Sequence, residues 1–516
     1  MKKPKLNLSN YEVILGPPGT GKTTHLLKQI DTLLLEYPLN KILFSSFTRA
    51  AVEEATSRIS KADPEHLLYF RTIHSLCYRL GTTPDIVTNN NMIEFSKIVG
   101  IPITFKHPKR EEQLVNLFEG DYYLWLYGLQ RASLRYDKKS TLLFISEANE
   151  HIHRPVNQLK YSHFVESYEK FKKDRGGLQD YTDILLSYIG NGEEPDINAA
   201  IIDEAQDLTY LQWKVVEKLT RKAKKLYIAG DDDQAIFSWS GAEPDILVNT
   251  LVEGPRRNLV QSYRLPENIK TFADRIIRKI PKENRIEKWF HPTKKKGRVV
   301  ENMDSDAFRA KITATTKNEK DETSVILIRN KRFGEFFEEK LNMFGMPTYH
   351  EDSESLLEAM RLWAILDSGG SIGKYELLVL YHNLKRTAVA YGFKKKVLTY
   401  TGEQTEFDVL SLIADFGLLK EPGDDLNTVF DMNNTNPVMV QAFQKGIRPI
   451  LITTIHKSKG REWDNVFLFM GMTRRTFASY KKNPEAEHRV FYVGASRAKK
   501  YLGIIEANAK MRYDYT

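Results

Sequence analysis

The sequence predicts an α/β protein with two parallel-sheet cores, each interrupted by an inserted, mainly helical subdomain. Two observations support this. Short apolar runs alternate with amphipathic stretches of helical period, a pattern typical of strands that helices cover on both faces. The alternation also occurs twice, within residues 11–231 and again within residues 324–470. We therefore expect two α/β cores rather than one continuous sheet.

Each expected element follows from a local pattern of apolar residues. In the first core we expect strands at 11–15, 41–47, 199–203 and 225–231, and helices at 22–35, 48–59 and 211–223. In the second core we expect strands at 324–330, 449–455 and 465–470, and a helix at 333–345.

Two stretches break the alternation. Residues 84–173 are aromatic-rich with a helical pattern, and residues 353–446 are helical and then polar, with 423–437 expected as a loop. The predicted domains are a first core (1–83 and 174–265) with an insertion (84–173), and a second core (266–352 and 447–516) with an insertion (353–446).

Length and composition limit the class of protein. A chain of 516 residues with 41% hydrophobic residues is expected to form several domains. The net charge of +9 fits a polyanionic partner, although a merely basic soluble protein has the same property. The single cysteine, Cys77, excludes an internal disulfide and any cysteine-based structural metal site. The sequence has neither a signal-peptide core nor a run long enough to cross a bilayer, so we expect a soluble cytoplasmic protein with no membrane contact and no structural metal.

A glycine-rich segment lies between the first expected strand and the first expected helix. Residues 16–24 match the pattern G-x-x-x-x-G-K-[ST]. Such glycines let backbone N–H groups face phosphate oxygens, and the helix N-terminus adds partial positive charge. Lys22 is expected to reach the β and γ phosphates, and the Thr23 hydroxyl to help hold Mg²⁺. The predicted ATP site comprises Gly16, Pro17, Pro18, Gly19, Thr20, Gly21, Lys22, Thr23 and Thr24.

Two acidic residues end the expected strand at 199–203. Asp203 is expected to bind Mg²⁺ through water, and Glu204 to orient or deprotonate the attacking water. A pair of helix-capping acids would look the same in isolation. Together with the glycine-rich segment, these acids predict a nucleoside triphosphatase that uses ATP and Mg²⁺.

Further segments resemble, in the same order, the motifs of the UvrD/Rep family of superfamily 1 helicases. They are residues 48–51, 72–75, 180–183, 230–242, 261–264, 454–463 and 487–498. The resemblance covers nearly the whole chain, which is identified as a compact member of the family. It implies two RecA-like cores, ATP-driven movement along single-stranded DNA, and ATP bound between the cores.

The resemblance also implies roles for individual residues. Gln234 would sense the γ phosphate, Arg264 and Arg497 would stabilise its charge, and Glu462 would contact the ribose. Stacking on bases would involve Phe47, Phe237 and Trp239, and contacts to nucleic-acid phosphates would involve Arg49, His74 and His456. The alternative readings are a surface ion pair for each arginine, core packing for Phe47 and Trp239, and structural roles for the histidines.

The sequence departs from the family pattern in three places. No glutamine precedes Gly16 to read the adenine edge, so we expect looser discrimination between ATP and other nucleotides. Ser240 occupies a position where the family usually has arginine. The sequence of the glycine-rich segment is more similar to that of superfamily 1 members that move 5′→3′, although the other motifs favour 3′→5′ movement.

Two lysine runs, at 294–296 and 394–396, have two possible explanations. They either contact nucleic acid or are simply solvated surfaces.

The favoured hypothesis is an ATP-dependent 3′→5′ DNA helicase of replication, repair or recombination. It would act on single-stranded DNA and on single-strand/duplex junctions, with replication or repair proteins as partners, in a bacterial or phage-infected cell. One alternative is a translocase that strips proteins from single strands, or powers a partner complex, with little unwinding alone. A nucleotide-gated binding switch is a third hypothesis, which the intact Lys22, Asp203, Glu204, Arg264 and Arg497 disfavour. RNA remains open as the track.

Overall fold

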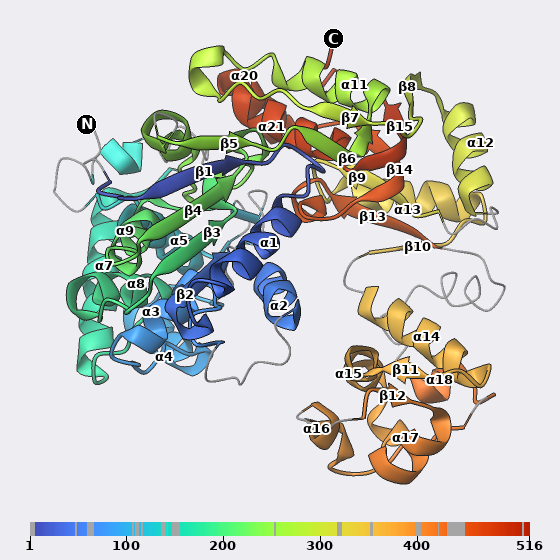
Figure 1. Cartoon of the computed structure of the whole chain (residues 1–516), viewed down its shortest axis with the longest axis horizontal. Coiled ribbons are helices and arrows are strands. Elements are labelled where there is room, and N and C mark those ends of the chain that lie inside the picture. The colour runs from blue at the N-terminus through green and yellow to red at the C-terminus, as the bar shows by residue number, and fades with distance from the viewer. Residues whose placement is uncertain are drawn as a thin grey trace. The chain divides into compact units, whose positions relative to one another are not determined.

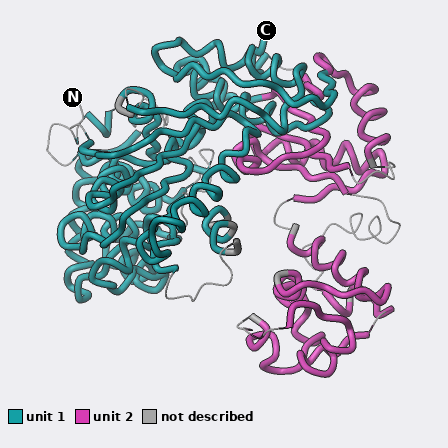
Figure 2. The backbone as a smooth tube through the Cα atoms, in the orientation of Figure 1, with its two compact units in different colours: residues 1–299, 472–502, 509–516 teal, residues 300–471, 503–508 magenta. Residues whose placement is uncertain are grey.

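The computed structural model describes most of the chain and divides it into two compact units (Figure 2). Unit 1 contains residues 1–299, 472–502 and 509–516, and unit 2 contains residues 300–471 and 503–508. The described residues are 6–46, 49–58, 67–105, 108, 113–114, 117–135, 141, 143–146, 155–251, 254–316, 322–350, 354–398, 400, 402, 404–421, 423–430, 449–507 and 510–516. The domain boundaries expected from the sequence stay a prediction.

Unit 1 contains a parallel sheet of five strands, in the order β2-β3-β4-β1-β5 (Figure 1). The strands are β1 (Tyr11–Leu15), β2 (Ile42–Ser46), β3 (Ala199–Asp203), β4 (Lys225–Gly230) and β5 (Arg256–Asn258). The expected strands at 11–15 and 199–203 are confirmed with the same bounds. The α/β class with parallel sheets is confirmed.

Apolar side chains are buried on both faces of this sheet. In β1, Val13 and Leu15 belong to one core cluster and Ile14 to the other, because successive strand side chains point to opposite faces. Helices α1 (Lys22–Leu34) and α2 (Arg49–Arg58) contribute to the cluster of Ile14. Helices α3 (Ile73–Leu80), α8 (Tyr181–Asn191) and α9 (Tyr210–Leu219) contribute to the other.

The first insertion is helical, as expected from its sequence. Its long helices are α4 (Asn89–Val99), α5 (Glu119–Ala132) and α7 (Gln158–Asp174). They share an aromatic core in which the Phe95 ring centroid lies 5.3 Å from that of Phe164 and 5.2 Å from that of Phe171. The aromatic richness of this stretch therefore fills a core of its own.

The remainder of unit 1 comes from two distant parts of the chain. Strands β6 (Gln261–Pro266) and β7 (His291–Thr293) form a parallel pair. Helix α11 (Glu267–Ile277) follows β6, and helices α20 (Arg474–Lys482) and α21 (Pro484–Ala495) come from near the end of the chain. Unit 1 therefore combines the glycine-rich segment with both segments that carry the predicted arginines.

The second sheet has six strands in the order β10-β13-β9-β14-β15-β8. They are β8 (Arg298–Met303), β9 (Ser324–Ile328), β10 (Thr348–Tyr349), β13 (Ile450–Thr454), β14 (Trp463–Phe469) and β15 (Ala498–Ile505). Pairs β10–β13, β13–β9 and β9–β14 are parallel. Helices α12 (Ser305–Thr316) and α13 (Phe333–Met343) accompany it.

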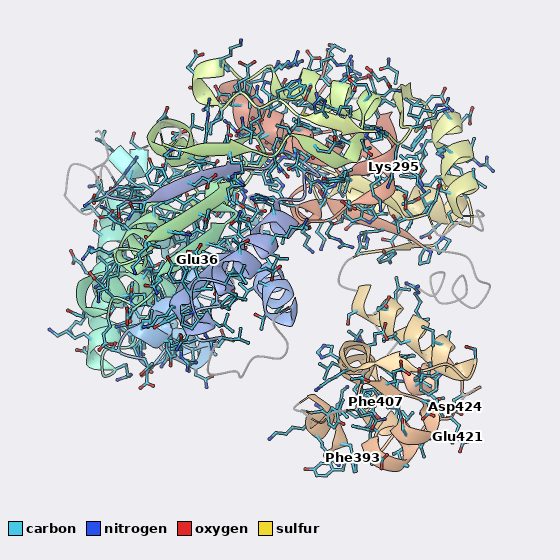
Figure 3. The ribbon with its side chains drawn as sticks, viewed as in Figure 1. Glu36, Lys295, Phe393, Phe407, Glu421 and Asp424 are labelled. Atoms are coloured by element: carbon cyan, nitrogen blue, oxygen red, sulfur yellow. The ribbon has the colours of Figure 1, made fainter. Side chains whose placement is uncertain are left out.

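The second insertion has its own core, in which Phe407 is fully buried (Figure 3). Its helices are α14 (Glu354–Asp367), α15 (Lys374–Asn383), α16 (Phe393–Leu398), α17 (Val409–Phe416) and α18 (Leu426–Val429), with a short antiparallel pair β11 (Ile372–Gly373) and β12 (Glu406–Phe407). The prediction of a loop at 423–437 is wrong in part, because helix α18 forms there and Val429 and Phe430 are buried. Residues 431–437 lie outside the described residues.

No helix in the described part of the chain is long and apolar enough to cross a membrane.

Candidate nucleotide and nucleic-acid site

The candidate site lies at the carboxyl edge of the unit 1 sheet. Strand β4 pairs with β1 on one side and β3 on the other, all in parallel, so the three strands end at the same edge. Gly16 N–H donates to the Gly230 carbonyl at 3.1 Å, which ties the glycine-rich loop to the end of β4. Parallel α/β sheets bind ligands at this edge. The loop, Asp203 and Asp231 therefore converge there.

The glycine-rich loop has a geometry suited to an anion. Gly19 and Gly21 both have φ of 72°, a left-handed conformation that side chains disfavour. Gly21 is the N-cap of α1 and offers no side-chain hydrogen bond, so the helix N-terminus is left for another acceptor. A Cβ at Gly16 would lie 2.8 Å from Cβ of Lys22, so the backbone at the start of the loop lies close against the first residue of α1. The residues present fit a phosphate group.

Lys22 makes an ion pair with the acids at the end of β3. Its Nζ donates to Glu204 Oε1 at 2.7 Å and lies 3.7 Å from Asp203 Oδ1. Burial opposes the charge on Lys22, but the fields of Glu204 and Asp203 outweigh it and raise the pKa of the ammonium. Lys22 is therefore a firmly held cation at the position where the sequence predicts phosphate contact.

Asp203 is buried at the end of β3, with 1% of its surface exposed. Burial raises the pKa of its carboxyl to about 6, although Lys22 opposes the shift. Glu204 follows with φ of 53°, a left-handed backbone conformation that ends the strand. A carboxylate and a hydroxyl are ligands that Mg²⁺ accepts, and Asp203 with Thr23 at the start of α1 would hold the ion.

Gln206 extends the contacts of Glu204 to the next strand. This residue is fully buried in the 3₁₀ helix η4 (Ala205–Asp207). Its Nε2 donates to Glu204 Oε2, and its Oε1 accepts from Asp231 N–H at 2.9 Å. This residue is not among the site residues predicted from the sequence. Its only signal is its position two residues after Glu204, which gives no indication of its partner.

Gln234 continues the hydrogen-bonded chain to an arginine from α21's end. Gln234 Nε2 donates to Asp231 Oδ2 at 2.7 Å, and Gln234 Oε1 accepts from Arg497 Nη2 at 2.7 Å. Arg497 is 1% exposed and also donates from Nε to the Val493 carbonyl at 3.0 Å. The structure thus joins Lys22, Glu204, Gln206, Asp231, Gln234 and Arg497 through consecutive hydrogen bonds.

Arg264 approaches the loop from β6. A Cβ placed on Gly19 would lie 2.3 Å from Cβ of Arg264, so the two backbones are in close contact. Ser262 Oγ donates to the Pro18 carbonyl at 2.9 Å, and Tyr263 N–H donates to the Gly19 carbonyl at 2.8 Å. Arg264 Nη1 also donates to the Ser496 carbonyl at 3.4 Å. The two predicted arginines therefore lie on neighbouring segments.

Tyr263 is a second residue beside the loop for which the sequence predicted no role. Its side chain is exposed, and a ring carbon lies 3.8 Å from the position of a Cβ on Gly21. An aromatic face beside the phosphate loop is suited to stacking on a nucleotide base. Its place between Ser262 and Arg264 is the only hint that the sequence offers.

The candidates for nucleic-acid contact in unit 1 are partly buried. Burial lowers the pKa of His74 to about 4, so the predicted contact with phosphate would be a hydrogen bond from a neutral ring. Trp239, in the 3₁₀ helix η6 (Ser238–Ser240), packs against the aromatic core of the first insertion. Phe237, just before it, is half-buried. Their roles stay predictions.

The remaining candidates lie outside the described residues or in other segments of the chain. Phe47 and the side chain of Arg49 lie outside the described residues. His456, in the 3₁₀ helix η11 (His456–Ser458), is buried in unit 2, and Glu462 is exposed just before β14 of that unit. The lysines 294–296 and 395–396 are exposed, and Lys295 is visible on unit 1 in Figure 3.

Comparison with known proteins indicates the family of the chain. A model of the UvrD/REP helicase N-terminal domain matches residues 2–252, and a model of the UvrD-like helicase C-terminal domain matches residues 411–509. The first covers the glycine-rich loop, Asp203, Glu204 and Gln234, and the second covers Glu462 and Arg497.

Individual relatives carry helicase names. A probable DNA helicase II homolog of Mycoplasma pneumoniae is 23% identical over 96% of this chain and 81% of its own length. DNA helicase II of Escherichia coli is 24% identical over 53% of this chain and 38% of its own length. ATP-dependent DNA helicase PcrA of Leuconostoc citreum is 25% identical over 51% of this chain and 37% of its own length. The match thus spans less than two fifths of the latter two relatives. With both family models matched in order, the chain belongs to the UvrD/REP family of ATP-dependent DNA helicases.

Proposed function

We propose that this chain hydrolyses ATP to move 3′→5′ along single-stranded DNA and to separate duplexes during replication, repair or recombination. The observation that supports it best is the hydrogen-bonded chain from Lys22 to Arg497. It links the phosphate loop to groups from three other segments of unit 1. A hydrolytic site that senses the γ phosphate needs such a link, since phosphate contacts must reach distant elements.

The contacts of Lys22 and Glu204 suggest how ATP would engage. Lys22 donates to Glu204, and a phosphate bound in the loop would compete for the same ammonium. Release from Lys22 would free Glu204 Oε1 to orient the attacking water while Gln206 still holds Oε2. Mg²⁺, held by Thr23 and Asp203, would supply positive charge to the phosphates when bound.

The arginines would complete the site from the other side of the loop. Arg264 lies beside Gly19, and Arg497 lies beside Gln234. Guanidinium groups suit this role because they stay charged and donate several hydrogen bonds to phosphate oxygens. Their side chains would make nucleotide binding sensitive to the positions of β6 and α21, as a motor requires.

Base recognition would be loose. The exposed Tyr263 ring can stack on any base, whereas the segment before Gly16 contains no glutamine to read a base edge. We expect kcat/KM for ATP and GTP to differ by about tenfold or less, because stacking does not distinguish base edges. Steady-state hydrolysis of both nucleotides measures this. A preference for ATP well above that range would contradict it.

Contacts with the DNA track are proposed for Phe47, Arg49, His74, Phe237, Trp239 and His456. DNA as substrate is supported by the names of the relatives. The alternative function is that of a translocase that powers a partner complex. Such a protein would also move along DNA, but it would separate little duplex on its own. Cytoplasmic location and partner proteins of replication or repair stay predictions from the sequence and the family.

The first test is ATP hydrolysis with and without single-stranded DNA. Replacing Lys22 by alanine should lower the DNA-stimulated kcat by about 100-fold or more, because it removes a charge that stabilises the transferred phosphate. The matched control is Lys28→Ala, an exposed lysine in the same helix, which should behave as wild type. Wild-type hydrolysis that is absent, or unaffected by Lys22→Ala, would refute the proposal.

A further inference from the structure

Three consecutive aspartates follow β4 and are buried together. Asp231, Asp232 and Asp233 are each 1% exposed or less, and they begin the segment that leads to Gln234. Three adjacent carboxylates in a buried place repel one another and lose their hydration, so each needs a cation or donors. The cations that compensate them come from another part of unit 1, the segment after α11.

Lys288 is the cation shared by all three carboxylates. Its Nζ lies 3.1 Å from Asp231 Oδ1 and 3.0 Å from Asp233 Oδ2, and it donates to Asp232 Oδ1. Only 2% of its side chain is exposed. Arg285 adds a bidentate pair with Asp233, with Nε at 2.9 Å and Nη2 at 2.6 Å from the two oxygens. The cluster therefore has two cations for three carboxylates.

Backbone contacts fix this cluster in place. Ile286 N–H donates to Asp232 Oδ2 at 2.9 Å, and Arg489 Nε of α21 donates to the Asp232 carbonyl at 3.0 Å. Burial raises the pKa of Asp232, with Lys288 opposing. For Asp233, burial acts in the same direction, but Lys288 and Arg285 outweigh it and lower the pKa. The ammonium of Lys288 is thus central to the electrostatics of the cluster.

The two oxygens of the Asp231 carboxylate have different partners. Its Oδ1 lies beside Lys288 and accepts from Asp233 N–H at 3.2 Å, while its Oδ2 accepts from Gln234 Nε2 at 2.7 Å. A carboxylate only accepts hydrogen bonds, so it selects the NH₂ end of the Gln234 amide. The carbonyl end must then face Arg497, which only donates, and it does so at 2.7 Å. The orientation of Asp231 therefore decides the orientation of Gln234.

We propose that Lys288 is a positioning residue for ATP turnover, because its buried ammonium holds Asp231 in the orientation that sets the Gln234 amide toward Arg497. This rests on the proposed function, in which Gln234 and Arg497 respond to the γ phosphate. Lys288 touches neither the phosphate loop nor Arg497 in the described contacts. It acts through Asp231 and Gln234, from an element that the nucleotide motifs do not include.

The test compares two variants that differ in Lys288. Asp232→Asn alone keeps Lys288 beside Asp231. The double variant Lys288→Met with Asp232→Asn removes one cation and one carboxylate, so the net charge of the cluster equals that of the wild type. We expect DNA-stimulated kcat of the double variant to be about tenfold or more below that of Asp232→Asn, since displaced groups near the reacting phosphate slow turnover strongly. KM for ATP should change by less than about threefold, because the Lys22 loop is untouched.

A purely structural role would give a different pattern. If Lys288 acts through Gln234, then adding Lys288→Met to a background of Asp232→Asn with Gln234→Ala should cost little further kcat. Equal kcat in the double variant and in Asp232→Asn, or losses that multiply independently of Gln234, would overturn the proposal. Wild-type protein without ATP hydrolysis would instead refute the proposed function itself.

A second variant covers the case in which the double variant does not fold. Asp231→Asn leaves two cations with two carboxylates, so the buried cluster becomes neutral. The asparagine amide has both a donor and an acceptor end and no longer selects the NH₂ end of Gln234. We expect this variant to fold, as judged by circular dichroism, and to lose kcat by about tenfold or more. Wild-type kcat in folded Asp231→Asn would overturn the proposal.

Discussion

Asp203 shows how a single buried carboxylate serves function at a cost in stability. Its folded-state pKa of about 6 lies above the ordinary value of 3.8. The folded protein therefore binds this proton more tightly than the unfolded chain, and the contribution of Asp203 to stability falls as pH rises from about 4 through about 6. At neutral pH the residue is a charged group held in a place that disfavours charge, a property that is common among functional acids and agrees with the proposed role in holding Mg²⁺.

Replacing Asp203 by asparagine should therefore stabilise the nucleotide-free protein. The upward shift of about two pKa units corresponds to up to about 3 kcal/mol in the free energy of unfolding at pH 8. Thermal unfolding at pH 8 and pH 4 measures it, and the gain should shrink at pH 4, where Asp203 is already protonated. ATP hydrolysis should be lost in the same variant.

The matched control for this variant is Asp196→Asn. Asp196 is an exposed acid whose pKa is lowered by a hydrogen bond from Lys41 and by its charge, so its removal should give no gain. A variant Asp203→Asn that is less stable than wild type at pH 8 would contradict the account of the site.

Gly19 tests the close contact between the phosphate loop and β6. Alanine at this position would place Cβ 2.3 Å from Cβ of Arg264 and 2.9 Å from Ser262 Oγ, at a φ of +72°. We expect a cost of about 1–2 kcal/mol from the left-handed backbone, and in addition a loss of DNA-stimulated ATP hydrolysis as Arg264 is displaced. Thermal unfolding and steady-state hydrolysis measure the two effects.

Gly100 offers a control with the same backbone but open space. It has φ of +65° at the end of α4, and a Cβ there would meet nothing within 4 Å. Gly100→Ala should carry only the cost of the left-handed backbone and keep wild-type hydrolysis. Equal activity in both alanine variants would mean that the contact of Gly19 with Arg264 does not matter for turnover.

At the level of elements, the helices of the first insertion are tied to the core by a buried ion network. Arg131 of α5 donates to Asp183 at 2.6 Å and to Asp180 at 2.6 Å, and Asp180 is the N-cap of α8. Lys172 of α7 also donates to Asp183. The Arg131 side chain is only 4% exposed, so little water replaces these contacts when the arginine is removed.

Replacing Arg131 by methionine should destabilise unit 1 by up to about 3–5 kcal/mol, because it leaves two mostly buried acids with Lys172 as their remaining cation. The control is Arg175→Met, whose pair with Glu94 is about half exposed on both sides. That change should cost less than about 1 kcal/mol, as surface ion pairs do. Thermal unfolding measures both. Similar losses in the two variants would argue against a buried anchor at α5.

The sequence was informative where the signal is local. Strands β1 and β3 and the start of α1 follow directly from apolar runs and the glycine-rich pattern. The short helix α18 was not predicted, because the polar residues around it suggested a loop. Burial of Val429 and Phe430 decides its conformation instead. Tertiary packing outweighs local propensity in such short segments.

Partners that are distant in the chain could not be predicted. Gln206 and Asp231 meet because β3 and β4 are neighbours, and Lys288 reaches Asp231 from a segment 57 positions later. A sequence without an alignment shows which residues can donate or accept, but it does not show which of them are adjacent. The resemblance to the family identified Gln234, Arg264 and Arg497, yet their mutual contacts came only with the structure.

For the whole molecule, unit 1 holds most of the proposed hydrolytic groups. Lys22, Asp203, Glu204, Arg264 and Arg497 come from segments that span residues 22 to 497 of the chain. Unit 2 carries Glu462 and His456, and its insertion has a core of its own. In the proposed function, hydrolysis in unit 1 must be linked to unit 2 for the chain to move along DNA.

The most direct test of this account is strand displacement on two partial DNA duplexes, one with a 3′ single-stranded tail and one with a 5′ tail, in the presence of ATP and Mg²⁺. We expect unwinding from the 3′ tail only, and none with Lys22→Ala. Unwinding from the 5′ tail only would contradict the proposed polarity. If neither duplex opens while single strands still stimulate ATP hydrolysis, the chain is a translocase that needs a partner, and the claim of unwinding is wrong.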